Sequence, residues 1–110
     1  MQPDTVVLVL TTWPAAGDPA PLAHALVESG AAACVSLLPE VDSVYRWQGR
    51  VERERERQLL VKTTAGRVAA VREQIARLHP YEVPELLVVE VAGGGDAYLR
   101  WVRESTSDPL

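Results

Sequence analysis

Residues 41–62 constrain the fold more than any other stretch, because their sequence predicts one long β-hairpin. The dipeptide Gln48-Gly49 is typical of a two-residue hairpin turn, in which the glycine supplies positive φ. Glutamate and arginine then alternate over residues 52–57. A helix would stack like charges four residues apart, although its i,i+3 pairs would be favourable. A strand separates the two signs onto opposite faces, and the apolar residues 59–61 favour the strand.

The same turn determines which residues face each other across the hairpin. Counting outwards from the turn, Asp42 lies opposite Arg55 and Glu40 lies opposite Arg57. Both pairs join opposite charges, which favours this register. We expect the remainder of the Glu/Arg run to be a solvated ribbon of charge.

Shorter periodic segments on either side of the hairpin predict the other elements. Residues 5–11 and 85–91 are rich in aliphatic and β-branched side chains, so each predicts a strand. Three segments have apolar residues at helical spacing, and Gly30 and Pro80 end the first two. We expect residues 105–110 to be frayed. The predicted helix caps are Asp18, with Pro19 at the first helical position, then Thr64 and Asp96.

These elements follow the order β-α-β-β-α-β with a terminal helix. The order predicts one α+β domain over residues 1–110, with an antiparallel sheet in the split β-α-β arrangement. Helices in this arrangement cover one sheet face, so the other should be polar at alternate positions. Residues 6–10, 59–61 and 86–89 are instead apolar at consecutive positions. The hairpin strands also outrun their neighbours by roughly 20 Å. We therefore predict an obligate oligomer in which the hairpin pairs with a neighbouring copy.

Composition excludes several classes of function. The net charge is −4 and residues 1–45 contain no lysine or arginine, which argues against a nucleic-acid partner. No stretch approaches the roughly 20 apolar residues of a membrane helix, and no signal peptide is evident. The single cysteine, Cys34, cannot form an internal disulfide, so we expect a cytoplasmic protein without a membrane partner.

A polar loop after the second predicted helix is the strongest candidate for a functional site. Residues 79–85 combine an imidazole, a phenol and two carboxylates with two prolines, which stiffen the backbone. A helix stop followed by an ordinary polar loop is the alternative. Lys62 is the only lysine beside ten arginines, which suggests a site that uses a compact ammonium group.

Five segments of the chain resemble the CutA divalent-cation tolerance family. They are Ala31-Ala32-Ala33-Cys34-Val35, Ser43-Val44-Tyr45-Arg46-Trp47-Gln48-Gly49, Val61-Lys62-Thr63-Thr64, Leu78-His79-Pro80-Tyr81-Glu82-Val83-Pro84-Glu85 and Tyr98-Leu99-Arg100-Trp101. Their order and spacing match over nearly the full chain. The resemblance implies a ferredoxin-like subunit in a homotrimer joined through its long β-hairpins, similar to the PII signalling trimers. It also implies a link to tolerance of copper and other divalent ions.

The metal ligands proposed for some bacterial members of that family are only partly present. Those members have a cysteine at the end of the first strand and paired histidines before the Pro-Tyr. The corresponding positions here are Thr11 and Leu78-His79, so His79 is the one remaining ligand, and one imidazole rarely holds a tight metal site. Cys34 is a second weak candidate, but it lies in an apolar run where a cysteine usually packs as a small hydrophobe. Cu2+ or another divalent cation is therefore expected to bind weakly.

The functional hypothesis is a non-enzymatic trimer that binds a metal or a small anionic ligand between subunits. Its predicted ligand contacts are Lys62, His79, Tyr81 and Glu85, with Tyr45 and Trp47 from a neighbour's hairpin. One alternative is a structural trimer that anchors another protein. The other is a thiol enzyme in which His79 would act as the base for Cys34.

Overall fold

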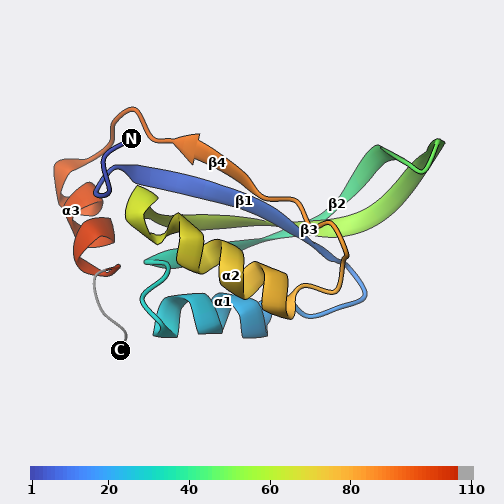
Figure 1. The fold of residues 1–110 in the computed structure, drawn as a ribbon, viewed down its shortest axis with the longest axis horizontal. Helices are drawn as coiled ribbons and strands as arrows, with labels where there is room; N and C mark the ends of the chain where they lie inside the picture. The colour runs from blue at the N-terminus through green and yellow to red at the C-terminus, as the bar shows by residue number, and fades with distance from the viewer. Residues whose placement is uncertain (107–110) are drawn as a thin grey trace.

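A computed structural model describes residues 1–106 as a four-stranded antiparallel sheet with helices beneath one face and at one end (Figure 1). The elements are β1 (Val6–Pro14), α1 (Ala20–Glu28), β2 (Cys34–Trp47), β3 (Arg50–Thr64), the 3-10 turn η1 (Ala65–Arg67), α2 (Val68–Leu78), β4 (Leu87–Glu90) and α3 (Asp96–Glu104). The strand order is β2-β3-β1-β4. The predicted element order and the α+β class are confirmed. Among the described residues, no helix has the length and apolar character needed to cross a membrane.

The core lies between the sheet and the two helices α1 and α2. Alternate residues of β1 and β3 point to this helix face, so their side chains are buried while their neighbours are directed to the opposite, open face. The helices contribute aliphatic side chains at helical spacing. The fully buried aliphatic side chains of these four elements are Val7 and Val9 of β1, Leu59 and Val61 of β3, Leu22 and Leu26 of α1, and Val71 and Ile75 of α2.

The hairpin has the turn and the register that the sequence predicts. Trp47 pairs with Arg50, and both residues of the intervening turn have positive φ, 50° at Gln48 and 78° at Gly49. These values fit the mirror-image turns whose twist matches that of the strands. The pairs Asp42–Arg55 and Glu40–Arg57 face each other as predicted.

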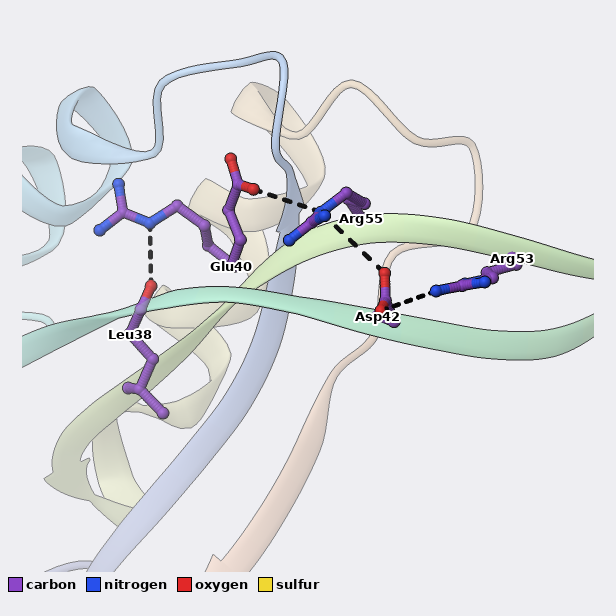
Figure 2. Close-up of polar contacts among 6 residues, drawn as sticks. Leu38, Glu40, Asp42, Arg53 and Arg55 are labelled. Atoms are coloured by element: carbon purple, nitrogen blue, oxygen red, sulfur yellow. Dashed lines mark hydrogen bonds and ion pairs between the residues drawn. The ribbon is translucent and has the colours of Figure 1, made fainter.

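A β-bulge interrupts β2 between Leu37 and Glu40, at the position of Pro39. Proline has no backbone N–H to donate, so a bulge accommodates it within a paired strand. The Leu38 carbonyl oxygen accepts a hydrogen bond of 2.9 Å from the Arg57 Nε (Figure 2). The bulge changes which residues of β2 point to the helix side of the sheet: Val35 and Leu37 do so before it, and Glu40 and Asp42 do so after it.

The shortest ion pairs on the hairpin are diagonal, and one longer pair joins residues directly across the strands. Arg53 lies 3.0 Å from Asp42, and Arg55 lies 3.3 Å from Glu40 and 4.0 Å from Asp42 (Figure 2). The Arg53 guanidinium, which bonds the Asp42 carboxylate, lowers the pKa of that carboxyl group. All four side chains are largely exposed, so these pairs favour the register but add little stability.

The hairpin extends beyond the rest of the sheet (Figure 1). The last pair between β1 and β3 is Pro14–Glu56, so residues 50–55 of β3 have no β1 partner. Six residues at about 3.3 Å each correspond to an overhang of about 20 Å. The outer edge of β2 also has no partner strand within the described part of the chain. The predicted overhang is therefore present.

All three predicted helix caps are wrong in detail. Pro19, which was predicted as the first helical position, is the N-cap of α1, and Asp18 lies one residue before it, where its carboxylate accepts a hydrogen bond from the Ala20 N–H at 3.0 Å. The Thr64 side chain makes no such bond, because the chain first forms η1 and the α-helix starts only afterwards. Asp96 is the first residue of α3, and Gly95 occupies the cap position.

The structure also changes three predicted boundaries. β1 covers Val6–Pro14 and so extends three residues beyond the predicted 5–11. β4 covers only residues 87–90 of the predicted 85–91, because the polar loop continues through residue 86. Thr106 is 3% exposed and its hydroxyl donates to the Val102 carbonyl oxygen at 2.9 Å. The expectation that the C-terminus is frayed is therefore wrong at Thr106. The same expectation covered residues 107–110, which lie outside the described residues.

Candidate functional site

A pocket of about 790 Å³ lies between the polar loop and the hairpin. Its lining consists of residues 80–85 of the loop, Ser43, Val44, Tyr45, Trp47 and Glu56 of the hairpin, and Thr12 of β1. Thr12 and Glu56 belong to the open face of the sheet, because their neighbours in sequence point to the helices. The pocket is thus built where the open face meets the base of the hairpin.

His79 supports the loop from below. α2 ends at Leu78, and His79 is its C-cap, whose backbone turns to the extended conformation that precedes proline. The imidazole is 9% exposed; its Nε2 lies 2.6 Å from the Thr12 carbonyl oxygen, and its Nδ1 accepts the Tyr81 N–H at 3.0 Å. These partners define a neutral ring protonated on Nε2, since Nδ1 must accept. The ring also packs against Trp13 and Tyr81, with centroids 4.7 and 4.9 Å away.

Tyr81 and Glu56 form the polar centre of the pocket. The Tyr81 hydroxyl donates a 3.0 Å hydrogen bond to the Glu56 carboxylate, which belongs to a residue only 6% exposed. The ion pairs of the described residues do not include Glu56. Glu85 accepts a 2.8 Å hydrogen bond from the Gln58 amide, which also donates to the Thr11 carbonyl oxygen at 2.7 Å.

The environment of Tyr81 has a measurable consequence at alkaline pH. Burial, then the hydrogen bond to Glu56 and the negative charge of that carboxylate, raise the pKa of Tyr81 from 10.0 to about 12. Because the folded state holds the phenolic proton more tightly than the unfolded chain, this group stabilises the fold fully below about pH 10. That contribution is lost as the pH rises through about 12.

We predict that ultraviolet titration of the native protein detects a phenolate forming near pH 12. The Tyr81→Phe variant assigns that transition, which is needed because burial also raises the pKa of Tyr45. Glu56→Gln should lower the pKa of Tyr81, since it removes a negative charge and leaves burial in place. A Tyr81 transition at pH 10 in the folded protein would contradict the contact.

Four of the six predicted ligand contacts line the pocket, namely Tyr45, Trp47, Tyr81 and Glu85. A fifth, His79, lies directly beneath the pocket, where it is bonded to Thr12 and Tyr81. Tyr45 and Trp47 come from the chain's own hairpin, where a neighbour's hairpin was predicted. Sequence reasoning missed Glu56, which it placed in the solvated ribbon. The reason lies in the register between β1 and β3, which the sequence alone does not give: Glu56 pairs with Pro14 and is the last β3 residue beside β1, so it lies within the body of the sheet.

Lys62 lies elsewhere on the open face. It pairs with Leu8 and Cys34, whereas Thr12 pairs with Gln58, four residues and about 13 Å further along β3. The Lys62 ammonium donates to the Ser36 hydroxyl and lies 3.6 Å from the Cys34 sulfur. Within one chain, therefore, the structure joins Lys62 to neither His79 nor Glu85.

The same separation applies to Cys34 and His79, the proposed nucleophile and base. Cys34 lies at the level of Lys62, and the His79 ring is bonded at the level of Thr12. The Cys34 thiol is partly buried. The geometry of one chain therefore gives no support to the thiol-enzyme alternative.

The residues present do not fit a tight metal site within one chain. In the described part, residues 1–106, no group of three or more His, Cys, Asp or Glu side chains is placed to hold an ion. Both His79 nitrogens are occupied by backbone partners. Thr11 and Leu78 stand where some members of the resembled family have a metal-binding cysteine and histidine. Thr11 is buried and its hydroxyl has no hydrogen-bond partner among the described residues, and Leu78 is exposed on α2.

The fold places the chain in a class of small α+β proteins with a four-stranded antiparallel sheet and three helices. The family model described as "CutA1 divalent ion tolerance protein" matches residues 7–105, and the chain belongs to this family. The divalent-cation tolerance protein CutA of Thermus thermophilus is 44% identical over 99 residues, which are 90% of this chain and 96% of that protein.

Solved structures agree with this assignment. The Cut A1 protein of Thermus thermophilus has a TM-score of 0.89 at 43% identity, covering 93% of this chain and 99% of that one. CutA1 of the psychrotrophic bacterium Shewanella sp. SIB1 has a TM-score of 0.90 at 31% identity, covering 98% and 100%. The expected CutA resemblance is confirmed, and the family is described by ion tolerance rather than by a reaction.

Proposed function

We propose that this protein is a non-enzymatic homotrimer that contributes to tolerance of divalent metal ions by binding a small ligand or ion and signalling its presence. The open face of the sheet is the observation that carries this proposal. Leu87 and Val89 of β4 are 55% and 43% exposed, and they adjoin the half-buried Leu8, Leu10 and Leu60 on the same face. A continuous apolar face of this kind needs a partner surface.

The overhanging hairpin also supports an assembly of several chains. Both of its edges carry backbone groups without a strand partner, and such edges favour pairing with another copy of the chain. Three is the number of subunits expected from the resemblance to CutA and PII trimers. We place the assembly in the cytoplasm, because a single cysteine suits a reducing compartment.

Native mass spectrometry with and without added copper tests the proposal. We expect a trimer of 12.0 kDa chains that binds copper weakly and without fixed stoichiometry, since no described cluster of ligands can hold it. A monomer at micromolar concentration would refute the assembly. Copper retained at a fixed ratio to the trimer would instead mean that ligands from different chains form a site at the interface.

A further inference from the structure

The pocket is negatively charged, whereas the predicted contact with Lys62 implied a positively charged site. Glu56, Glu82 and Glu85 contribute carboxylates to its wall, and none of its lining residues is lysine or arginine. Lys62, which was expected to attract an anion here, is engaged with Ser36 on another part of the open face. Electrostatics in the pocket therefore favour a cation.

Glu56 is the strongest single indication. Its side chain is only 6% exposed and faces the pocket, yet its hydrogen bond comes from the neutral hydroxyl of Tyr81. A buried carboxylate needs an opposite charge to offset the cost of losing water. Since the ion pairs among residues 1–106 of one chain supply none, a cation from outside the chain would complete this site.

Aromatic rings define what kind of cation fits. Tyr45 and Trp47 are 39% and 42% exposed at the pocket wall, and Tyr81 completes the set from the loop. The faces of such rings attract ammonium and guanidinium groups and cover apolar ligand surface. A bare metal ion makes no use of these rings and requires several ligand atoms at short range.

We propose that the pocket binds an organic ammonium or amidinium cation with an apolar body, with the charge at Glu56 and the body against Tyr45 and Trp47. This inference rests on the proposed function, because it names the ligand class of the proposed ligand site. The Tyr81 hydroxyl orients the carboxylate, and the stiff loop between Pro80 and Pro84 forms the outer wall.

The test compares three ligands of nearly the same shape by isothermal titration calorimetry on the intact assembly. They are phenethylamine, which is cationic, 2-phenylethanol, which is neutral, and phenylacetate, which is anionic. We expect phenethylamine to bind at least about tenfold more tightly than 2-phenylethanol, because a charge-assisted contact is stronger than a neutral one. Tryptophan fluorescence gives an independent signal, since Trp47 lines the pocket.

Two variants that each remove one negative charge distinguish a specific effect of Glu56 from an effect of the protein's overall charge. Glu56→Gln should weaken phenethylamine binding at least about tenfold while retaining an oxygen that accepts the Tyr81 hydrogen bond. Glu73→Gln is the matched control, because this exposed glutamate lies on α2, away from the pocket, and should leave binding unchanged.

Each contrary outcome has a distinct meaning. Equal binding of phenethylamine and 2-phenylethanol, or preference for phenylacetate, would overturn the cation assignment but keep a ligand pocket. Failure of all three ligands to bind would overturn the inference alone, because native mass spectrometry with and without copper tests the proposed function separately. Binding only to dissociated chains would mean that a neighbouring copy fills the pocket, which also overturns the inference.

Discussion

Replacing Leu87 with lysine should dissociate the assembly into folded chains of 12.0 kDa. Leu87 is 55% exposed on the open face, so a lysine there meets water in a single chain and costs little folding energy. Between subunits the same ammonium would be buried against Leu10 and its neighbours without an opposite charge. Light scattering after gel filtration measures the mass, and circular dichroism confirms that the chain remains folded.

Leu78→Lys is the control for that experiment. Leu78 is also a well-exposed leucine, 40% exposed, but it lies at the end of α2 on the helix side of the sheet. We expect this variant to retain the mass of the unmodified assembly. Equal masses for the Leu87→Lys variant and the original protein would show that the open face is not the contact surface.

Replacing His79 with leucine should lower the free energy of unfolding by about 2–4 kcal/mol, because one buried and one partly buried backbone group lose their partner. These groups are the Thr12 carbonyl and the Tyr81 N–H, both bonded to the imidazole. Urea unfolding at one fixed protein concentration measures the effect, since the stability of an oligomer depends on concentration.

His24→Leu gives the matched comparison. The His24 side chain is 77% exposed on α1, so its replacement should change stability by less than about 0.5 kcal/mol. Should His79→Leu unfold like the original protein yet lose copper binding, His79 would be a metal ligand, and its structural role at the base of the loop would be refuted.

The hairpin was predictable from sequence because its determinants are local. The turn residues and the pairs that follow from them depend only on spacing along residues 40–57, and the structure has that register. The first helix was predictable for the same reason, since Asp18 and Gly30 act on their immediate neighbours. The prediction that Thr64 caps the second helix failed because the backbone after Thr64 forms η1, where it hydrogen-bonds to residues near the N-terminus.

The pocket was only partly predictable. The loop was found from its composition, since two prolines among polar side chains are visible without a structure. The role of Glu56 depends on where β1 ends beside β3, and the charge of the site depends on Lys62 lying about 13 Å further along the sheet. These are relations between strands far apart in sequence, which composition does not encode.

The bulge at Pro39 has a consequence for how this chain can change over generations. Side chains of a strand alternate between faces, so one additional residue inverts every position beyond it. Tyr45 and Trp47 lie beyond the bulge in β2 and face the pocket. The turn at residues 48–49 fixes which residues of β2 and β3 face each other, so deleting one residue between Leu37 and Glu40 would remove the bulge and leave both rings on the pocket side. This segment can therefore lose one residue without loss of the pocket, because the bulge is where β2 takes up a change of length.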